Sequence, residues 1–141
     1  MQHARPIYET QTQLKNEQGI AKHVADQWGG VMVKLPKMYP IDYIFTQDSI
    51  CLAWVEIKSR EVPRDKYLTY FFNVDKAMFG KQLAHETGLP FLLVVSWAGD
   101  IAFLNFKKAY PIKFCGRQDR GDWQDQSPAY EIPIDEFESL T

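Results

Sequence analysis

The sequence has few of the residues that mark common redox, nucleotide and zinc sites. It contains two cysteines, Cys51 in an apolar stretch and Cys115 in a polar one, and their separation fits no zinc-binding pattern. It has no P-loop, no Gly-x-Gly-x-x-Gly segment, no Cys-x-x-Cys pair and no Gly-x-Ser-x-Gly elbow. These absences argue against a nucleotide-binding enzyme, a thiol oxidoreductase and a serine hydrolase. We expect both thiols to be reduced, as in a cytoplasmic protein.

Long apolar runs and a positive charge surplus are also missing. No run is long enough for a membrane span, and no charged-then-apolar start indicates a secretion signal, so we expect a cytoplasmic protein without membrane contact. His3, His23 and His85 are scattered, which disfavours a histidine-based site. The net charge of −2 lacks the basic surplus common in nucleic-acid-binding chains, so any phosphate-binding face depends on local charge distribution.

The 141 residues have the length and composition of one globular domain, and we expect residues 1–141 to form it. Hydrophobic periodicity predicts a helix over 10–28, strands over 31–35, 41–46 and 50–58, a helix over 75–87, and strands over 91–97 and 101–106. Asp75 is the expected N-cap of the second helix and Gly88 its stop. Beyond these we expect a loop over 116–128, a strand over 130–134 and a short helix over 135–140.

The most informative segment is the predicted strand 50–58, which reads ICLAWVEIK. Side chains alternate along a strand, so Glu56 and Lys58 project from the same face at its end. Burying a lone charge is costly, and an apolar strand seldom keeps charged groups without a use. Asp42 lies in the preceding apolar run, and the turn 46–49 predicts a hairpin that brings Asp42 close to Glu56. Two carboxylates beside one ammonium are typical of a site for a divalent metal ion and a water molecule.

These residues resemble the signature of the PD-(D/E)xK nuclease superfamily. Pro40-Ile41-Asp42 matches its first half, with Ile41 as an extra residue, and Glu56-Ile57-Lys58 matches its second half after thirteen intervening residues. The resemblance implies an α/β, restriction-endonuclease-like fold with an αβββαβ core and a mixed sheet flanked by helices, as in small resolvase-type nucleases of bacteria or phages. Periodicity alone gives the same order of elements. We expect the core to span about 8–106 and residues 107–141 to elaborate it.

The resemblance also implies a role for each residue. Asp42, Glu56 and the carbonyl of Ile57 are expected to bind Mg²⁺ or Mn²⁺, while Lys58 orients or deprotonates the attacking water. The implied reaction is hydrolysis of phosphodiester bonds in DNA, most simply by an endonuclease. The exonuclease pattern Gln-x-x-x-Tyr is not present, because Gln82 is followed four residues later by Glu86.

Glu17 is a further candidate, found from helical periodicity. It falls on the same stripe of the first predicted helix as Leu14, Ala21, Val24 and Trp28. A carboxylate on a core-facing stripe is unusual, and small archaeal Holliday-junction resolvases carry an acid at a similar distance before their first metal-binding Asp. We therefore include Glu17 among the catalytic and metal-binding residues, with Glu9 as its competitor.

Weaker indications concern the substrate and the oligomeric state. Lys34, Lys37, Arg60 and Lys76 gather in sequence around the motif, and with Gln82 they are candidate DNA contacts. A solvated surface role explains each basic residue equally well, and it is the simpler explanation for Lys76 and Gln82. The aromatic segment 67–72 could stack on bases, form a packed strand or support a homodimer. Two alternatives to a nuclease stay open: a catalytically idle module of the same fold that binds nucleic acid or a partner, and a purely structural Glu56–Lys58 ion pair.

Overall fold

The computed structural model describes the backbone of residues 5–115 and 127–140, and the side chains of 16–114 and 127–140. Its helices and strands follow one another in this order: α1 Arg5–Trp28, β1 Val31–Lys34, β2 Tyr43–Gln47, β3 Ile50–Ser59, β4 Thr69–Asn73, α2 Val74–Thr87, β5 Phe91–Trp97, β6 Asp100–Asn105, β7 Ile112–Cys115, β8 Ser127–Pro133 and β9 Glu138–Ser139. The predicted αβββαβ order is therefore present in α1, β1, β2, β3, α2 and β5. No helix in the described part of the chain is both long and apolar enough to cross a membrane.

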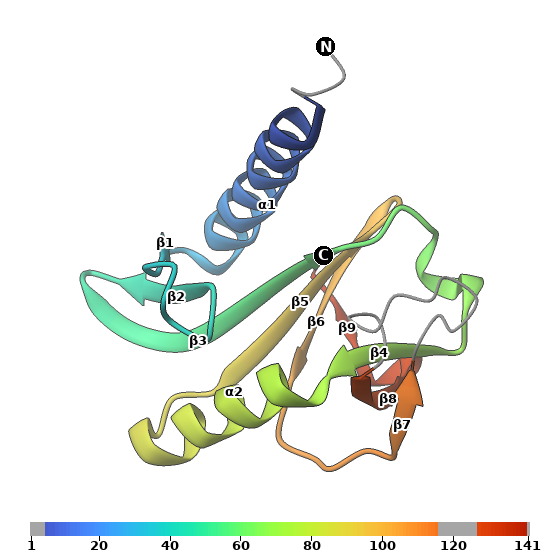
Figure 1. Cartoon of the computed structure of the whole chain (residues 1–141). Helices are drawn as coiled ribbons and strands as arrows, with labels where there is room; N and C mark the ends of the chain where they lie inside the picture. The colour runs from blue at the N-terminus through green and yellow to red at the C-terminus, as the bar shows by residue number, and fades with distance from the viewer. Residues whose placement is uncertain (1–4, 116–126, 141) are drawn as a thin grey trace.

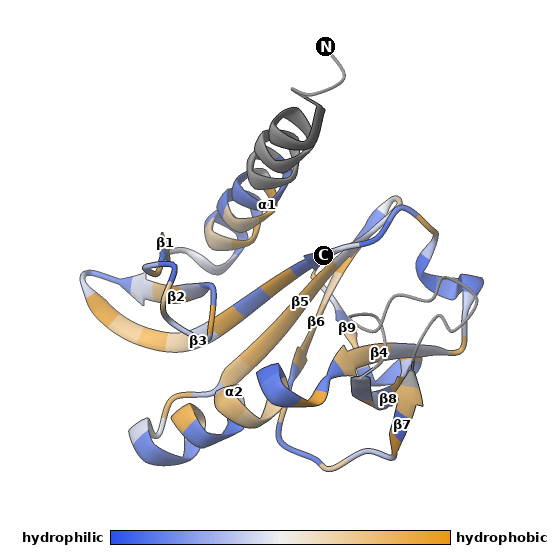
Figure 2. Cartoon of the chain, viewed as in Figure 1, coloured by the Kyte–Doolittle hydropathy of each residue, from blue (hydrophilic) through white to orange (hydrophobic). Residues whose placement is uncertain are grey.

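A six-stranded sheet in the order β1-β2-β3-β5-β6-β9 forms the body of the molecule (Figure 1). β3 and β5 are parallel and the other neighbours in this sheet are antiparallel, so the sheet is mixed, as predicted. A parallel pair needs a long crossover connection, and α2 lies within the segment that joins β3 to β5. β5 is hydrophobic along most of its length (Figure 2), as expected of a strand covered on both faces.

Two apolar clusters lie on the two faces of this sheet. Ala21, Val24 and Ala25 of α1 pack against one face, which includes Val55 and Ile57 of β3. Ala77 of α2 belongs to the other cluster, with alternate residues of β5 and the aromatic residues of the second sheet. Because side chains alternate along β3, Trp54, Glu56 and Lys58 face the α2 side. The sheet therefore separates α1 from α2 and determines which helix each site residue faces.

α2 begins at Val74, one residue before the predicted start, and its N-cap lies two residues before the predicted one. The side chain of Asn73 accepts a hydrogen bond from the backbone N–H of Lys76, so Asn73 is the N-cap and the prediction of Asp75 was wrong. Asp75 instead lies in the first helical turn, where a carboxylate interacts favourably with the helix dipole. The helix ends as predicted at Gly88, whose φ of 75° is in the left-handed region and whose N–H bonds to the carbonyl of Ala84 at 2.9 Å.

The C-terminal part differs most from the sequence-based expectation. The predicted strand 130–134 is β8, which pairs with β4 and β7 in a separate three-stranded sheet. The predicted helix 135–140 was wrong: a short 3₁₀ helix Ile134–Glu136 precedes β9, which pairs with β6. Burial of Phe137 against Tyr70 and Trp97 draws this segment onto the sheet. Of the predicted loop 116–128, residues 116–126 lie outside the described residues, and Ser127 and Pro128 belong to β8.

Candidate active site

The β2–β3 hairpin brings the two acids of the motif together. Asp48 and Ser49 form its tight turn, with positive φ angles of 53° and 67°. Tyr43 of β2 pairs with Val55 of β3, so Asp42, just before β2, lies beside Glu56. The backbone N–H of Asp42 donates to Oε1 of Glu56 at 3.3 Å, and the carbonyl of Asp42 accepts from Leu35 at 2.8 Å. Asp42 is thus held just before the first residue of β2, opposite the part of β3 that extends past the end of their pairing.

Glu56 is the charged side chain that the described part of the structure buries completely. Its Oε2 atom lies 3.3 Å from Nζ of Lys76 and 3.6 Å from Nζ of Lys58, but neither contact has hydrogen-bond geometry. Desolvation, together with the nearby Asp42 carboxylate, raises the pKa of Glu56 to about 7, while the two lysines oppose this rise. This buried oxygen is therefore balanced by cationic side chains and not by hydrogen bonds.

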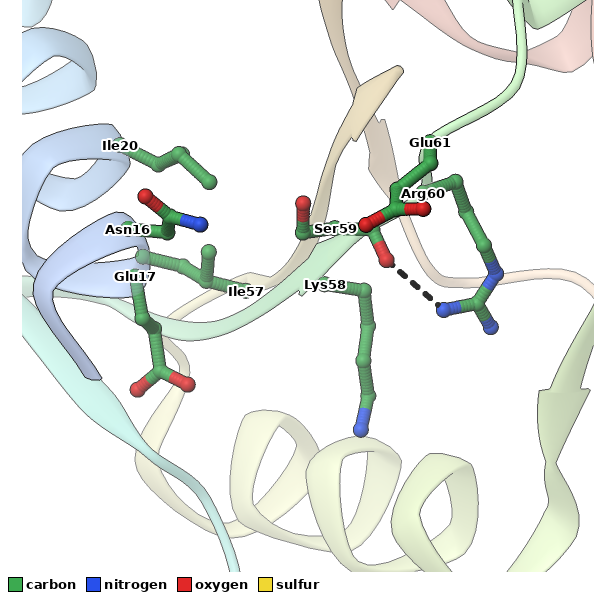
Figure 3. A pocket seen from close by; sticks show the side chains of 8 residues that line it. All are labelled: Asn16, Glu17, Ile20, Ile57, Lys58, Ser59, Arg60 and Glu61. Atoms are coloured by element: carbon green, nitrogen blue, oxygen red, sulfur yellow. Dashed lines mark hydrogen bonds between the residues drawn. The ribbon is translucent and has the colours of Figure 1, made fainter. Parts of the chain in front are cut away.

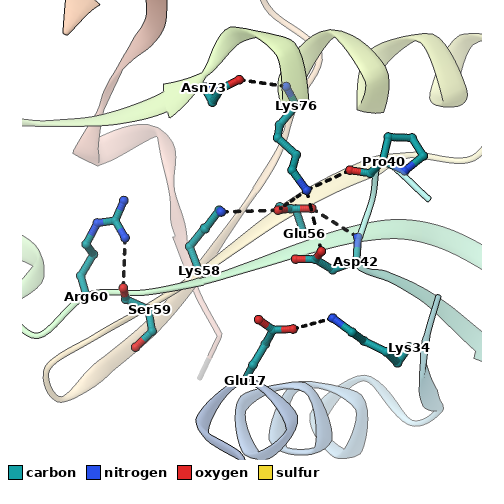
Figure 4. Close-up of polar contacts among 10 residues, drawn as sticks. All are labelled: Glu17, Lys34, Pro40, Asp42, Glu56, Lys58, Ser59, Arg60, Asn73 and Lys76. Carbon is teal, nitrogen blue, oxygen red and sulfur yellow. Dashed lines mark hydrogen bonds and ion pairs between the residues drawn. The ribbon is translucent and has the colours of Figure 1, made fainter. Parts of the chain in front are cut away.

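Lys76 from α2 bridges the two acids (Figure 4). Besides its contact with Glu56, its ammonium lies 3.8 Å from Oδ1 of Asp42 and donates to the carbonyl of Pro40 at 3.0 Å. The sequence indicated Lys76 only as a weak DNA contact. Nothing in the local pattern marks it for this position, because its approach depends on how α2 packs over the sheet.

Lys58 projects from the end of β3 on the same side as Glu56, as alternation predicts (Figure 4). Its side chain is 36% exposed, so it remains open to solvent, whereas Glu56 is not. With Ile57, Ser59 and Arg60 it lines a cavity of about 280 Å³ that extends to Glu17 and Ile20 of α1 (Figure 3). The cavity has room for several water molecules next to the lysine.

Glu17 lines this cavity, but its carboxylate pairs with Lys34 and not with the lysines that contact Asp42 and Glu56. It comes from α1, on the opposite face of the sheet from α2, and its Oε1 accepts from Nζ of Lys34 at 2.9 Å (Figure 4). The buried hydroxyl of Tyr43 lies close enough that its burial and the Glu17 charge raise the Tyr43 pKa far above its ordinary value. Among the residues whose side chains are described, no three His, Cys, Asp or Glu residues are grouped closely enough to share an ion.

Only some of the remaining predicted substrate residues lie next to the acids. Lys34 forms an ion pair with Glu17, and Lys37 is exposed. Arg60 is exposed at the end of β3, where it donates to the carbonyl of Ser59 at 3.0 Å and lies over the ring of Tyr70. Gln82 donates to Glu86 at 3.2 Å on the outer surface of α2 and makes no contact with the acids. Arg60 is therefore next to the candidate site, and Gln82 is not.

The buried hydroxyl of Tyr70 is a feature that the sequence did not indicate. It has no hydrogen-bond partner in the structure, and burial, with a contribution from the Glu56 charge, raises the Tyr70 pKa to about 12. The structure places residues 69–73 in β4, in agreement with the packed strand considered for this aromatic segment, with Tyr70 and Phe72 buried and Phe71 exposed. That expectation could not have indicated that the hydroxyl comes near the acids.

Comparison with solved structures defines the class of fold. The chain resembles the 1.6 Å structure of Hjc from Archaeoglobus fulgidus, a Holliday junction resolvase from an archaeal hyperthermophile, with a TM-score of 0.53. The match covers 83% of this chain and 84% of that chain, at 11% sequence identity. It confirms the predicted restriction-endonuclease-like fold. No curated protein sequence matches the chain.

The family comparison is more specific. Residues 3–140 match the family model described as "Phage putative PDDEXK endonuclease". Because the match covers nearly the whole sequence, the chain belongs to this family of PD-(D/E)xK endonucleases. Membership confirms the nuclease function predicted from the residues around Asp42 and Glu56.

Proposed function

We propose that this protein is a metal-dependent endonuclease that hydrolyses phosphodiester bonds in DNA, with Asp42, Glu56 and Lys58 as its catalytic residues. The observation that supports this most directly is the contact between the acids: Asp42 donates its N–H to a fully buried Glu56, whose second carboxylate oxygen has no hydrogen-bond donor. A single structural ion pair needs one acid and one lysine, whereas here Asp42 and a fully buried Glu56 share Lys76, and Glu56 also contacts Lys58.

The oxygen donors present suit Mg²⁺ or Mn²⁺, which prefer carboxylate and carbonyl ligands. Asp42 and Glu56 would hold the ion, with the carbonyl of Ile57 as a further ligand and Glu17 contributing from across the cavity after release from Lys34. When bound, the ion would polarise the phosphate and stabilise charge on the leaving oxygen. Protonated Glu56 would be a poor ligand, so its pKa of about 7 predicts weak metal binding in mildly acidic solution.

The protein's own groups supply the rest of the mechanism. Lys58 contacts Glu56 and borders the water-accessible cavity, so its ammonium can orient the attacking water or exchange a proton with it. Arg60, just after β3, and Lys37, in the loop between β1 and β2, are exposed and would neutralise DNA phosphates. Arg64 is unavailable for this, because it binds Asp100 and the carbonyl of Phe137 at 2.9 and 2.7 Å.

We further propose that branched DNA is among the substrates and that the active form is a homodimer in the cytoplasm. The resemblance to a resolvase fold supports the first suggestion. A dimer would place two single-metal sites against the two strands of one substrate. The exposed free thiol of Cys51 suits a reducing compartment.

A plasmid-nicking assay in MgCl₂, MnCl₂ or EDTA tests the proposal, using the variants Asp42→Asn, Glu56→Gln and Lys58→Met. We expect each variant to lose at least about 100-fold in cleavage rate, since each removes a ligand or a proton-transfer group. Lys22→Met is the matched control, because Lys22 is exposed and pairs only with Asp26 one turn away on α1. A panel of linear duplex, single strand, flap, four-way junction and RNA would identify the preferred substrate.

Cleavage that persists in EDTA, or in both Glu56→Gln and Lys58→Met with circular dichroism unchanged, would refute the proposed chemistry. The alternative is an idle module that binds DNA without cutting it. One observation favours it: the bridging ammonium of Lys76 already neutralises the two acids. DNA binding that does not depend on metal, with no nicking of any substrate, would establish that alternative.

A further inference from the structure

Lys76 occupies the gap into which a cation shared by Asp42 and Glu56 would have to enter. Its ammonium lies within 4 Å of one oxygen of each acid, and among the described side chains no other cationic group does so. Lys58, by comparison, contacts Glu56 alone. The third contact of Lys76, with the carbonyl of Pro40, fixes the ammonium at the start of the motif.

Two acids so close together repel each other unless a positive charge lies between them. In the protein without metal, Lys76 supplies that charge. The backbone of Lys76 is fixed in the first turn of α2, because its N–H is bound by the Asn73 cap. Its side chain is 34% exposed, so the ammonium has an open path to solvent by rotation of its own side chain.

We propose that Lys76 holds the metal position in the metal-free protein and that a divalent ion must displace its ammonium in order to bind. This inference rests on the proposed metal-dependent function and deepens it. Lys76 is then a positioning residue with two effects: it keeps the carboxylates together before metal arrives, and it weakens metal binding by competition. After displacement the ammonium lies at the rim of the same site, where it can approach a phosphate of the substrate.

The consequence is opposite to that of an ordinary contact in a metal site. Removing a residue that supports metal binding weakens the affinity, whereas removing a competing cation strengthens it. The variant Lys76→Met keeps the length of the side chain and removes only the charge. It should therefore bind metal more tightly than the wild type and be less stable in EDTA.

Titration calorimetry with MnCl₂ at pH 8.5, without DNA, gives the affinity when proton competition at the acids is small. We expect Lys76→Met to bind Mn²⁺ at least about tenfold more tightly than the wild type, since a cation a few ångströms away disfavours the ion strongly. Lys58→Met, which removes a charge that touches one acid only, should produce a clearly smaller gain. Lys22→Met should leave the affinity unchanged.

A second measurement uses the unmodified protein and does not depend on a variant that folds. Acetic anhydride labelling, quantified by mass spectrometry, reports how accessible each lysine amine is. Labelling of Lys76 should rise severalfold when MnCl₂ is added, while labelling of Lys22 stays constant as the internal reference. If Lys76 only supported the fold, MnCl₂ would not raise its labelling, and Lys76→Met would not bind Mn²⁺ more tightly than the wild type.

The outcomes separate this inference from the function on which it rests. Metal binding that Lys76→Met weakens or leaves unchanged, or Lys76 labelling that metal does not raise, would overturn the inference and leave the nuclease proposal intact. If the wild type binds no Mn²⁺ at all, both are overturned.

Discussion

Glu56 should make the metal-free protein less stable at neutral pH than at acidic pH. Its folded-state pKa of about 7 lies above the ordinary value of 4.5, because burial and Asp42 disfavour the charged form. Between these two values the folded state binds more protons at this site than the unfolded state does. Stability due to Glu56 is therefore complete below about pH 4.5 and declines as the pH rises towards 7.

The replacement Glu56→Gln isolates this effect, since glutamine has the shape of the protonated acid. A pKa difference of about 2.5 corresponds to about 3 kcal/mol, because each pKa unit is worth about 1.4 kcal/mol. Full burial of the carboxylate means that solvent screening does not reduce this value much. In EDTA we expect Glu56→Gln to match the wild type at pH 4.5 and to exceed its free energy of unfolding by up to about 3 kcal/mol at pH 8.

Urea unfolding followed by tryptophan fluorescence at pH 4.5, 6, 7 and 8 measures the difference. MgCl₂ at pH 8 should stabilise the wild type but not the variant, because only the wild type retains both ligands. Glu136→Gln is a control of opposite sign: hydrogen bonds from Lys108 and Tyr110 lower the Glu136 pKa, so its replacement should cost stability at pH 8. A difference between Glu56→Gln and wild type that does not vary with pH would refute the reasoning.

Two further predictions concern α1 and α2. Glu17→Gln should weaken Mn²⁺ binding in calorimetry far more than Glu9→Gln does, if Glu17 leaves Lys34 to join the ion; equal effects would exclude Glu17 from the site. Gly80→Ala should lower the free energy of unfolding by about 1 to 3 kcal/mol, because a Cβ there would collide with the ring of Phe91. At Gly19 a Cβ would meet nothing within 4 Å, so Gly19→Ala should raise the free energy of unfolding by about 0.5 to 1 kcal/mol. If both alanine variants lost the same free energy of unfolding, the packing explanation would be wrong.

The order of elements in the core and the hairpin that brings Asp42 near Glu56 were predictable, because hydrophobic periodicity, strand alternation and turn signals are local. Alternation along 50–58 determines the face of Glu56 and Lys58, and a tight turn at Asp48 and Ser49 closes the hairpin. The register then shifts by one residue between Phe45 and Thr46, and this bulge, which the sequence analysis did not predict, brings Asp42 opposite Glu56 rather than Val55. The comparison with a resolvase structure confirms the fold that the local signals predict.

The features that were not predictable depend on contacts between distant segments. β9 forms because Phe137 is buried next to Tyr70 and Trp97, although the residues around it had the composition of a short helix. β7 was missed because residues 112–115 have no strong alternation; it is defined by pairing with β8. The partner of Glu17 on α1 is Lys34 of β1, and helical periodicity carries no information about a residue outside the helix.

The charges around Glu56 lower the stability of the fold, and they are also the groups that the proposed function requires. A fully buried carboxylate beside a second acid destabilises the fold, and the two lysines reduce that cost without satisfying the Oε2 atom. An apolar residue in place of Glu56 would pack in the same space without the penalty. A partner that binds the folded state would offset the penalty, and the oxygen donors present suit the hard cation that we propose. In the proposed mechanism the two lysines have different roles: Lys58, which lines the cavity, acts on water, and Lys76, which contacts both acids, holds the position that the cation would take.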